Sequence, residues 1–327
     1  MTDAASLLAM RLLFVSGKGG VGKTTLSAAL ALAAAKRGRR VLLVEVGPQE
    51  NFSRLFGAEP GGHTENAVAE NIWALNLHPH RALEEYLETQ LYSRRLVRMI
   101  AGNPLFRQLV DVAPGFRDLM TLGKIWHLES QRDPETNRPR YDLIIVDTPA
   151  TGQGLAFLQT PGAFVKAIRF GPPKTHSQWV RDLIEDPRRT RLVLVTIPEE
   201  LPVNEAAEMA RAAGEKLRVP FELVLVNAVA PKLFTEKEAQ QIARISGDEA
   251  LVARLDDALE GEVKATALLR IARATVQRRA LHAHHIRRLR ARVRKPMIQL
   301  PFVYHTDLSL EDLRALGEMI VESGEAS

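Results

Sequence analysis

One short segment near the N-terminus constrains this chain more than any other feature. It reads Gly17-Lys18-Gly19-Gly20-Val21-Gly22-Lys23-Thr24-Thr25 and lies between the apolar run Leu12–Ser16 and an Ala-rich stretch of helical character. A G-x-x-x-x-G-K-[ST] loop between a buried strand and a helix wraps phosphate groups with its backbone N–H groups. Average composition would produce the four fixed residues by chance on the order of one time in a hundred chains of this length. The segment therefore predicts a nucleoside triphosphate site, with Mg-ATP as the expected ligand.

Each part of this loop has an expected role. Lys23 should reach the β- and γ-phosphates, the Thr24 hydroxyl should ligate Mg²⁺, and Thr25 should lie near the α-phosphate. The following helix adds the positive end of its dipole. The backbone cradle is expected from Gly17, Gly19, Gly20, Val21 and Gly22.

An acidic residue at the end of a later strand supports the same site. The run Tyr141–Asp147 is apolar up to its last residue and is followed by Thr148-Pro149-Ala150-Thr151-Gly152. In phosphate-loop enzymes a carboxylate at this position holds Mg²⁺ directly or through water. An Asp at a strand end can also be a simple cap, but beside the glycine loop Asp147 is predicted to share the magnesium ion with Thr24.

Short apolar runs alternate with helical stretches along most of the chain. This alternation predicts an α/β fold with a parallel, doubly wound sheet covered on both faces. Helices are expected from Thr24 to about Lys36, from Pro202 to Leu217 and from about Ser309 to about Glu322. The predicted strands are Leu12–Ser16, Val41–Glu45, Ile72–Leu77, Leu143–Asp147, Leu192–Ile197, Leu223–Asn227 and Met297–Val303.

Two strand-poor stretches, His80–Arg132 and Gly162–Asp186, interrupt this alternation. We expect them to form one helical subdomain, about 79–136 and 161–189, inserted into a single phosphate-loop ATPase domain. The core of that domain is predicted at about 1–78, 137–160 and 190–327. Apolar residues at helical spacing usually pack a core, and most of those in the insertions should do so. A minority could line a groove for an apolar client.

The absence of cysteine excludes several classes of function. None of the 327 residues is Cys, so disulfides, thiolate zinc sites, thiolate-held iron–sulfur clusters and cysteine nucleophiles are impossible within the chain. No zinc or iron–sulfur cluster is expected. No run of about 18 apolar residues occurs, and the N-terminus lacks the pattern of a signal peptide. We expect a cytoplasmic protein without a transmembrane segment.

The net charge of +5 is concentrated in the segment Arg278–Lys295. A basic helix can meet phosphate, anionic lipid or an acidic partner, but such charge runs are more often solvated helix faces. Three histidines, His282, His284 and His285, lie among the arginines. Other ligands at suitable spacing are not apparent, so a metal site there is the weaker interpretation.

The extra lysine, Lys18, marks a deviant form of the phosphate loop. With it the chain resembles the ATPases that include nitrogenase iron protein, partition ATPases, and the arsenite-pump and tail-anchored-protein-targeting ATPases. Asp147–Pro161 is similar to switch II of the last branch, D-T-A-P-T-G-H-T-L-R-F-L-x-x-P, with Gln153 in place of His. Further similarity to this branch lies in Val226-Asn227, Leu300-Pro301-Phe302 and Pro114-Gly115-Phe116. The resemblance spans nearly the whole chain and indicates a Cys-free, bacterial-type member.

The resemblance implies further roles. Lys18 would reach across a dimer to the partner's nucleotide, Asn227 would recognise adenine, and the segment with Pro301 and Phe302 would close over the base. Nucleotide state would be coupled through switch II to a surface on the helical subdomain. A hydrophobic or membrane-protein client is one partner that this implies.

Switch I departs from the branch. The family pattern D-P-A-H-N-L-S-D-A-F-G corresponds here to Gly47–Gly57, so the Asp that positions the attacking water is replaced by Gly47. Glu45, Gln49 or Glu50 could take over this role, and Glu45 is the best placed, at the end of its strand. Its alternative role is to anchor switch I without acting on water. The predicted catalytic residues are Lys18, Lys23, Glu45 and Asp147.

Several functions remain open on this basis. The leading one is an ATP-driven dimeric switch, as a homodimer or as a heterodimer with a paralogue. A hydrolysis-poor subunit paired with an active paralogue is the alternative that Gly47 suggests. A metalloid-efflux pump ATPase would lack the thiolates that bind the metalloid, and the helical insertion argues against a DNA-binding partition protein, so no stable DNA binding is expected. A nitrogenase-type reductase is excluded because no cysteine can hold a cluster.

Overall fold

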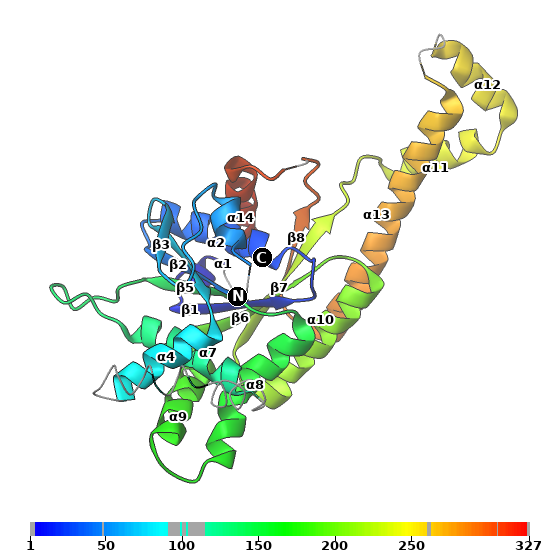
Figure 1. The fold of residues 1–327 in the computed structure, drawn as a ribbon. Helices are drawn as coiled ribbons and strands as arrows, with labels where there is room; N and C mark the ends of the chain where they lie inside the picture. Colours follow the sequence, from blue (N-terminus) through cyan, green and yellow to red (C-terminus); the bar gives the residue numbers. More distant parts are fainter. Residues whose placement is uncertain are drawn as a thin grey trace.

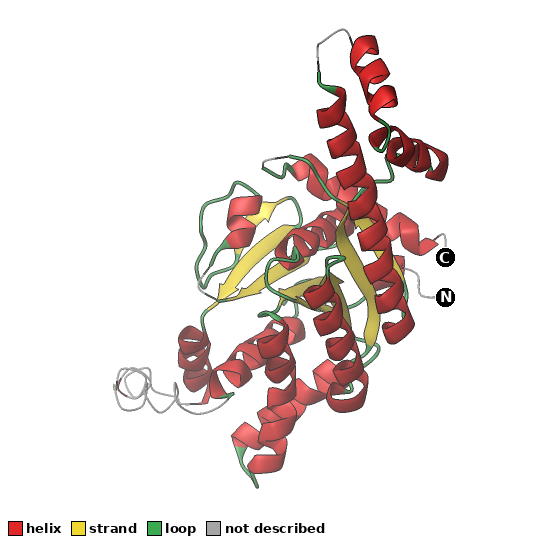
Figure 2. Cartoon of the chain, turned by 90° about the vertical axis from the view of Figure 1, so that its right-hand side faces the viewer, coloured by secondary structure: helices red, strands yellow, loops and turns green. Residues whose placement is uncertain are grey.

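The centre of the molecule is an eight-stranded sheet with helices on both faces (Figure 1, Figure 2). The computed structural model describes residues 4–47, 49–90, 99, 103, 115–259, 263–305 and 307–325. The strand order is β3-β4-β2-β5-β1-β6-β7-β8, and every described pairing is parallel except that of β3 with β4. The strands are β1 Leu12–Gly17, β2 Val41–Val46, β3 Asn66–Ala69, β4 Ile72–Leu77, β5 Leu143–Asp147, β6 Thr190–Thr196, β7 Phe221–Val229 and β8 Met297–Pro301. The predicted α/β fold is confirmed.

All seven predicted runs are strands, and β3 is the strand that the sequence prediction missed. It pairs antiparallel at the sheet edge, is four residues long and contains no fully buried residue. Such a half-exposed edge strand lacks the continuous apolar run that identifies a central parallel strand.

The helices fill the connections between these strands. The three predicted helices correspond to α2, to α10 with its π-helical extension Ala213–Leu217, and to α14. The helices are α1 Ala4–Leu8, α2 Lys23–Lys36, α3 Asn51–Leu55, α4 Pro79–Gln90, α7 Phe116–Ser130, α8 Thr151–Ala167, α9 Pro172–Glu185, α10 Glu200–Ala212, α11 Glu236–Ser246, α12 Glu249–Ala258, α13 Ala265–Val293 and α14 Leu310–Glu325.

The sheet separates two hydrophobic cores. Side chains alternate across each strand, so Leu13 and Val15 of β1 face one core while Leu12 and Phe14 face the other. The first core is closed by α1, α2 and α14, and the second by α7, α8, α9, α10 and the end of α13 nearest the sheet. Burial of both faces explains why the strands read as uninterrupted apolar runs.

Four helices, α4, α7, α8 and α9, lie together beyond one face of the sheet (Figure 1). A small separate cluster of Ala82, Leu83, Leu119 and Met120 packs α4 against α7. These helices fall largely in the predicted insertions, whose exact boundaries stay a prediction. Residues 91–98, 100–102 and 104–114 of the first insertion, with Pro114 of the Pro-Gly-Phe segment, lie outside the described residues.

A helical arm extends from the body of the molecule (Figure 1, Figure 2). It consists of α11, α12 and the part of α13 that packs on them. Neither α11 nor α12 contains a fully buried residue. The other end of α13 packs on α10 and β7 and carries the basic segment that the sequence indicates. The arm lies within the range that the sequence prediction assigned to the core.

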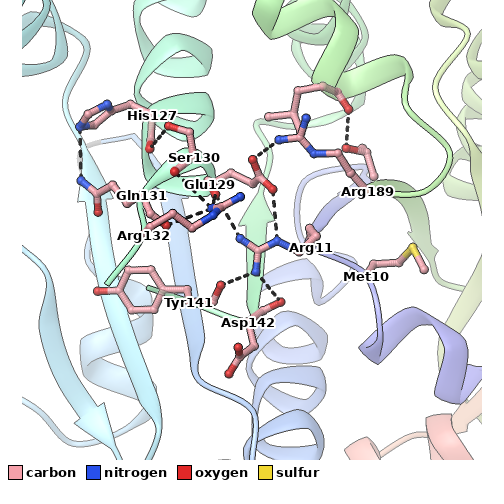
Figure 3. Close-up of polar contacts among 12 residues, drawn as sticks. Met10, Arg11, His127, Glu129, Ser130, Gln131, Arg132, Tyr141, Asp142 and Arg189 are labelled. Atoms are coloured by element: carbon pink, nitrogen blue, oxygen red, sulfur yellow. Dashed lines mark hydrogen bonds and ion pairs between the residues drawn. The ribbon is translucent and has the colours of Figure 1, made fainter. Parts of the chain in front are cut away.

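A buried ionic network fixes the amino ends of the central strands (Figure 3). The carboxylate of Glu129, from the end of α7, is almost completely buried and binds both Arg11 and Arg189. The Arg11 guanidinium also donates to the carbonyl oxygens of Tyr141 and Asp142, at 2.5 and 3.2 Å. Because these residues immediately precede β1, β5 and β6, the network holds the three strands and α7 in register.

Removing the buried carboxylate should therefore destabilise the fold. We predict that Glu129→Ala lowers the free energy of unfolding by about 3–5 kcal/mol, because two guanidinium groups lose their common partner. The exposed pair between Glu215 and Arg211, 3.9 Å apart, provides the control. Glu215→Ala should cost less than about 1 kcal/mol. Urea denaturation measures both, and equal losses would contradict the role assigned to Glu129.

Candidate nucleotide-binding site

The glycine loop lies at the carboxyl end of β1, in the middle of the sheet. Gly17 ends the strand, and Gly22, with a φ of 93°, precedes the first residue of α2. A Cβ on Gly17 would overlap the carbonyl oxygen of Val195 in β6, and a Cβ on Gly22 would overlap the side chain of Asn227. Close packing against β6 and Asn227 therefore requires glycine at these two positions. The loop and the N-terminus of α2, the positive end of its helix dipole, lie at the same edge of the sheet.

The Lys23 side chain folds back over the glycine loop to a backbone carbonyl group. Its Nζ donates to the carbonyl oxygen of Lys18 at 3.2 Å. Burial lowers the pKa of the Lys23 ammonium, and the negative charge of Asp147 opposes this shift. The half-buried cation therefore has one nearby carboxylate, and triphosphate oxygens would supply the missing negative charge.

Thr24 and Asp147 meet at the centre of the site. The Thr24 hydroxyl donates to Oδ2 of Asp147 at 2.5 Å. The other oxygen, Oδ1, is buried without a hydrogen-bond partner in the part of the chain that the structure describes. Burial raises the pKa of Asp147, while the hydrogen bond from Thr24 and the charge of Lys23 lower it.

These residues fit a magnesium ion. The free carboxylate oxygen and the adjacent hydroxyl are oxygen ligands of the kind that Mg²⁺ prefers, and in nucleotide sites it is bound by one or two protein ligands together with phosphates. Bound there, Mg²⁺ would neutralise charge on the phosphate oxygens. Within the described ranges, no group of three or more His, Asp or Glu side chains could hold a metal ion alone.

Switch I is anchored by Glu45. This carboxylate, 6% exposed at the end of β2, accepts hydrogen bonds from the Asn51 backbone at 2.8 Å and from the Asn51 side chain. Burial raises its pKa, and the bonds from Asn51 lower it. Oε2 thus caps the start of α3, and Oε1 holds the Asn51 side chain. This arrangement favours the anchoring role over a direct action on water.

The other switch I candidates are also engaged. Oε1 of Gln49 accepts from the Asn51 side chain at 3.2 Å, and Oε2 of Glu50 accepts from the Gly62 backbone at 3.3 Å. Gly47, with a φ of 140°, has open space where a Cβ would lie.

The residues expected at the base lie at the same edge, on β7 and β8. Nδ2 of Asn227 donates to the carbonyl oxygen of Val21 at 3.0 Å, which connects β7 to the glycine loop. Val229 lies opposite Pro301 in the sheet, and its carbonyl oxygen accepts from the Phe302 backbone at 3.0 Å. The Phe302 ring is 47% exposed and contacts the ring of Tyr304, with centroids 4.8 Å apart. An exposed aromatic pair at the end of β8, next to the end of β7, is suited to stack on a base.

Lys18 is paired with an acidic residue of α10. Its Nζ forms an ion pair with Oε1 of Glu205 on α10, at 3.1 Å, and both side chains are about one-third exposed. The lysine expected to act on a partner's nucleotide is therefore bound within its own chain in this structure.

Comparison with known proteins decides the family. The sequence pattern of the anion-transporting ATPases matches residues 10–175, which contain the glycine loop, Glu45 and Asp147. The chain belongs to the anion-transporting ATPase family.

Individual relatives agree with this assignment. ATPase BagA of Mycobacterium tuberculosis is 34% identical over 253 residues, covering 74% of this chain and 71% of the relative. An arsenical pump-driving ATPase of Escherichia coli is 29% identical over 267 residues, 74% of this chain but 43% of the relative. ATPase GET3 of Podospora anserina is 31% identical over 161 residues, 49% and 45% of the two chains. The protein is thus an ATPase.

The fold of this ATPase brings most of the predicted site residues to one edge. Thr24 contacts Asp147, and Asn227 contacts the glycine loop, whereas Lys18 and Glu45 are bound by other side chains. Sequence reasoning missed Asn51 as the partner of Glu45, although Asn51 lies within the switch I segment. Nothing in the sequence indicated Glu205 as the partner of Lys18. No described helix of this ATPase has the length and apolarity needed to cross a membrane.

The tight contact at Gly17 generates a prediction. Gly17→Ala should weaken ATP binding about 5- to 150-fold, because an added methyl group in a packed site costs about 1–3 kcal/mol. Titration with a fluorescent ATP analogue measures this. Gly214→Ala is the control, since nothing lies within 4 Å of a Cβ at that position. Unchanged affinity in Gly17→Ala would contradict the described approach of the loop to Val195.

Proposed function

We propose that this ATPase is a Mg-ATP-dependent dimeric switch, which couples the state of its nucleotide to a client or partner surface on its helical subdomain. The observation that carries the proposal is the continuity between Asp147 and α8. The strand β5 ends at Asp147, and α8 begins four residues later at Thr151 and runs to Ala167. A change at the phosphates can therefore move one long helix.

The start of α8 is packed closely against the phosphate site. A Cβ on Gly154 would lie 2.9 Å from the carbonyl oxygen of Pro149 and 3.0 Å from the hydroxyl of Ser16. The first turn of α8 therefore packs directly on the end of β1, next to the glycine loop. It supports switch II as the element that senses phosphate loss.

The far end of α8 forms part of an apolar cavity of about 240 Å³ between α4, α7, α8 and α9. Its walls include Leu83, Leu87, Phe116, Met120, Phe164 and Ile168. Displacement of α8 would change the shape of this cavity. Ligand pockets are typically concave and mostly apolar, so the cavity supports an apolar client.

Polar groups at the cavity are already paired. Burial alone would raise the pKa of Glu85, but hydrogen bonds from His63 and Lys124 lower it to about 2. The Tyr86 hydroxyl lies 3.0 Å from Nδ1 of His176. With these charges neutralised internally, the cavity favours an apolar client over an ionic one.

The position of Lys18 supports a dimer with nucleotides at its interface. An exposed ion pair such as that with Glu205 contributes less than about 1 kcal/mol, so Lys18 can leave it for a phosphate group. Both a homodimer and a heterodimer with a paralogue would meet this requirement. A cytoplasmic location stays a prediction from the sequence.

A hydrolysis-poor subunit that pairs with an active paralogue is the second candidate. It is favoured by Gly47 and by the engagement of Glu45, since neither supplies a free group to the attacking water. A metalloid-efflux pump ATPase is the third candidate, and the similarity to the E. coli relative supports it. That relative is named as an arsenical pump-driving ATPase, and the chain covers 43% of its length.

Steady-state ATP hydrolysis, measured with light scattering, tests the proposal. Lys23→Ala should lose nucleotide binding and turnover, because Lys23 is the cation inside the loop. Lys18→Ala should still bind ATP but lose ATP-driven dimer formation and turnover. Lys36→Ala, an exposed lysine at the far end of α2, is the control and should behave as wild type.

Two results would redirect the proposal. Normal dimer formation and turnover in Lys18→Ala would contradict the role of Lys18 across a dimer. ATP binding by the wild-type chain without turnover would favour the hydrolysis-poor subunit, and the search would move to a paralogous partner.

A further inference from the structure

Switch I leaves the attacking water without a positioning group. Enzymes of the phosphate-loop class hold this water with a polar side chain beside the γ-phosphate. Here Gly47 has no side chain, both oxygens of Glu45 bind Asn51, and the carboxylate of Glu50 accepts from Gly62. The amide oxygen of Gln49 accepts from Asn51 as well. A different segment must supply the group.

The first turn of α8 lies beside the glycine loop. The Cβ of Ala150 is 4.0 Å from the position that a Cβ on Gly19 would take. The Gln153 backbone then donates to the carbonyl oxygen of Ala150 at 2.9 Å. Gln153 is therefore three residues, about 4.5 Å along the helix axis, beyond a residue that faces the loop.

The side chain of Gln153 is free to act. It is exposed, and it forms no hydrogen bond with any residue that the structure describes. In this respect it differs from Glu45, Gln49 and Glu50 of switch I, whose side chains all accept hydrogen bonds. The first turn of α8 starts from the end of β5, so Gln153 is on the segment that also carries Asp147.

We propose that Gln153 orients the attacking water in ATP hydrolysis, in place of the carboxylate that is missing at Gly47. Its amide oxygen accepts a hydrogen bond from the water, and its amide N–H₂ can donate to an oxygen of the γ-phosphate. Gln153 is thus a catalytic residue that contacts both reacting groups.

The reaction balances without a proton on the glutamine. The water oxygen forms a bond to the γ-phosphorus, and the bond from that phosphorus to the oxygen bridging to ADP breaks. The water proton passes to a phosphate oxygen, which gives ADP and inorganic phosphate. A neutral amide suits this position because it adds no negative charge next to the triphosphate. The inference rests on the proposed ATP hydrolysis and does not require the client.

Single-turnover hydrolysis of Mg-ATP by the full chain tests this assignment, with ATP affinity measured in parallel. Gln153→Ala should lower the hydrolysis rate about 100-fold, the loss expected when a reacting group is no longer positioned. It should raise the ATP Kd by no more than about 10-fold, the loss of one hydrogen bond. Gln159→Ala provides a matched control. It removes the same side chain from the same helix, about 9 Å further from the loop. It should hydrolyse ATP at the wild-type rate.

A second variant separates catalysis from structure. Gln153→His keeps one hydrogen-bond donor and one acceptor in a neutral side chain, and it should hydrolyse ATP at least 10-fold faster than Gln153→Ala. A wild-type rate in Gln153→Ala would overturn the assignment. So would a rate that falls only in proportion to a weakened ATP affinity, or an equal loss in Gln159→Ala. Light scattering in the same samples reports the dimer separately, so failure of the dimeric switch is distinguishable from failure of this inference.

Discussion

The contact between the Thr24 hydroxyl and the Asp147 carboxylate is the interaction on which the site depends. It joins the start of α2, directly after the glycine loop, to the end of β5. It leaves one buried carboxylate oxygen without a partner among the described residues. Lys23 lies nearby as a half-buried cation. An unsatisfied buried oxygen and a desolvated cation are costly in isolation. A triphosphate with its magnesium ion would bind both groups, so the site is preorganised for that ligand.

The opposite edge of the sheet provides the rigidity that this site needs. Glu129 binds Arg11 and Arg189, and Arg11 also binds the backbone that precedes β5 (Figure 3). Because the amino ends of β1, β5 and β6 are held together there, their carboxyl ends keep a constant spacing. The segments after β2 and β5 can then respond to the nucleotide while the strands remain fixed.

Much of the fold and of the phosphate site could be predicted from local sequence. The glycine loop and Asp147 are recognisable because their chemistry requires particular residues directly after buried strands. The partners of Glu45 and Lys18 could not be predicted, since hydrogen bonds to Asn51 and Glu205 depend on how separate elements pack. The same holds for the basic helix. Its Arg279 donates to the carbonyl oxygen of Ala230 at 2.7 Å, and His282 accepts from the Ala230 backbone at 3.0 Å. Arg279 and His282 therefore support the segment after β7, while Arg278, Arg287 and Arg290 are exposed, as expected of a solvated helix face.

The most direct test of the account is calorimetric titration of ATP with and without Mg²⁺, in the wild-type protein and in Asp147→Asn. The account predicts that Mg²⁺ strengthens ATP binding to the wild-type protein. It predicts that this dependence is lost in Asp147→Asn, while Mg²⁺-free ATP still binds through the glycine loop and Lys23. The same dependence on Mg²⁺ in both proteins would contradict the assignment of Asp147 and Thr24 as the magnesium site.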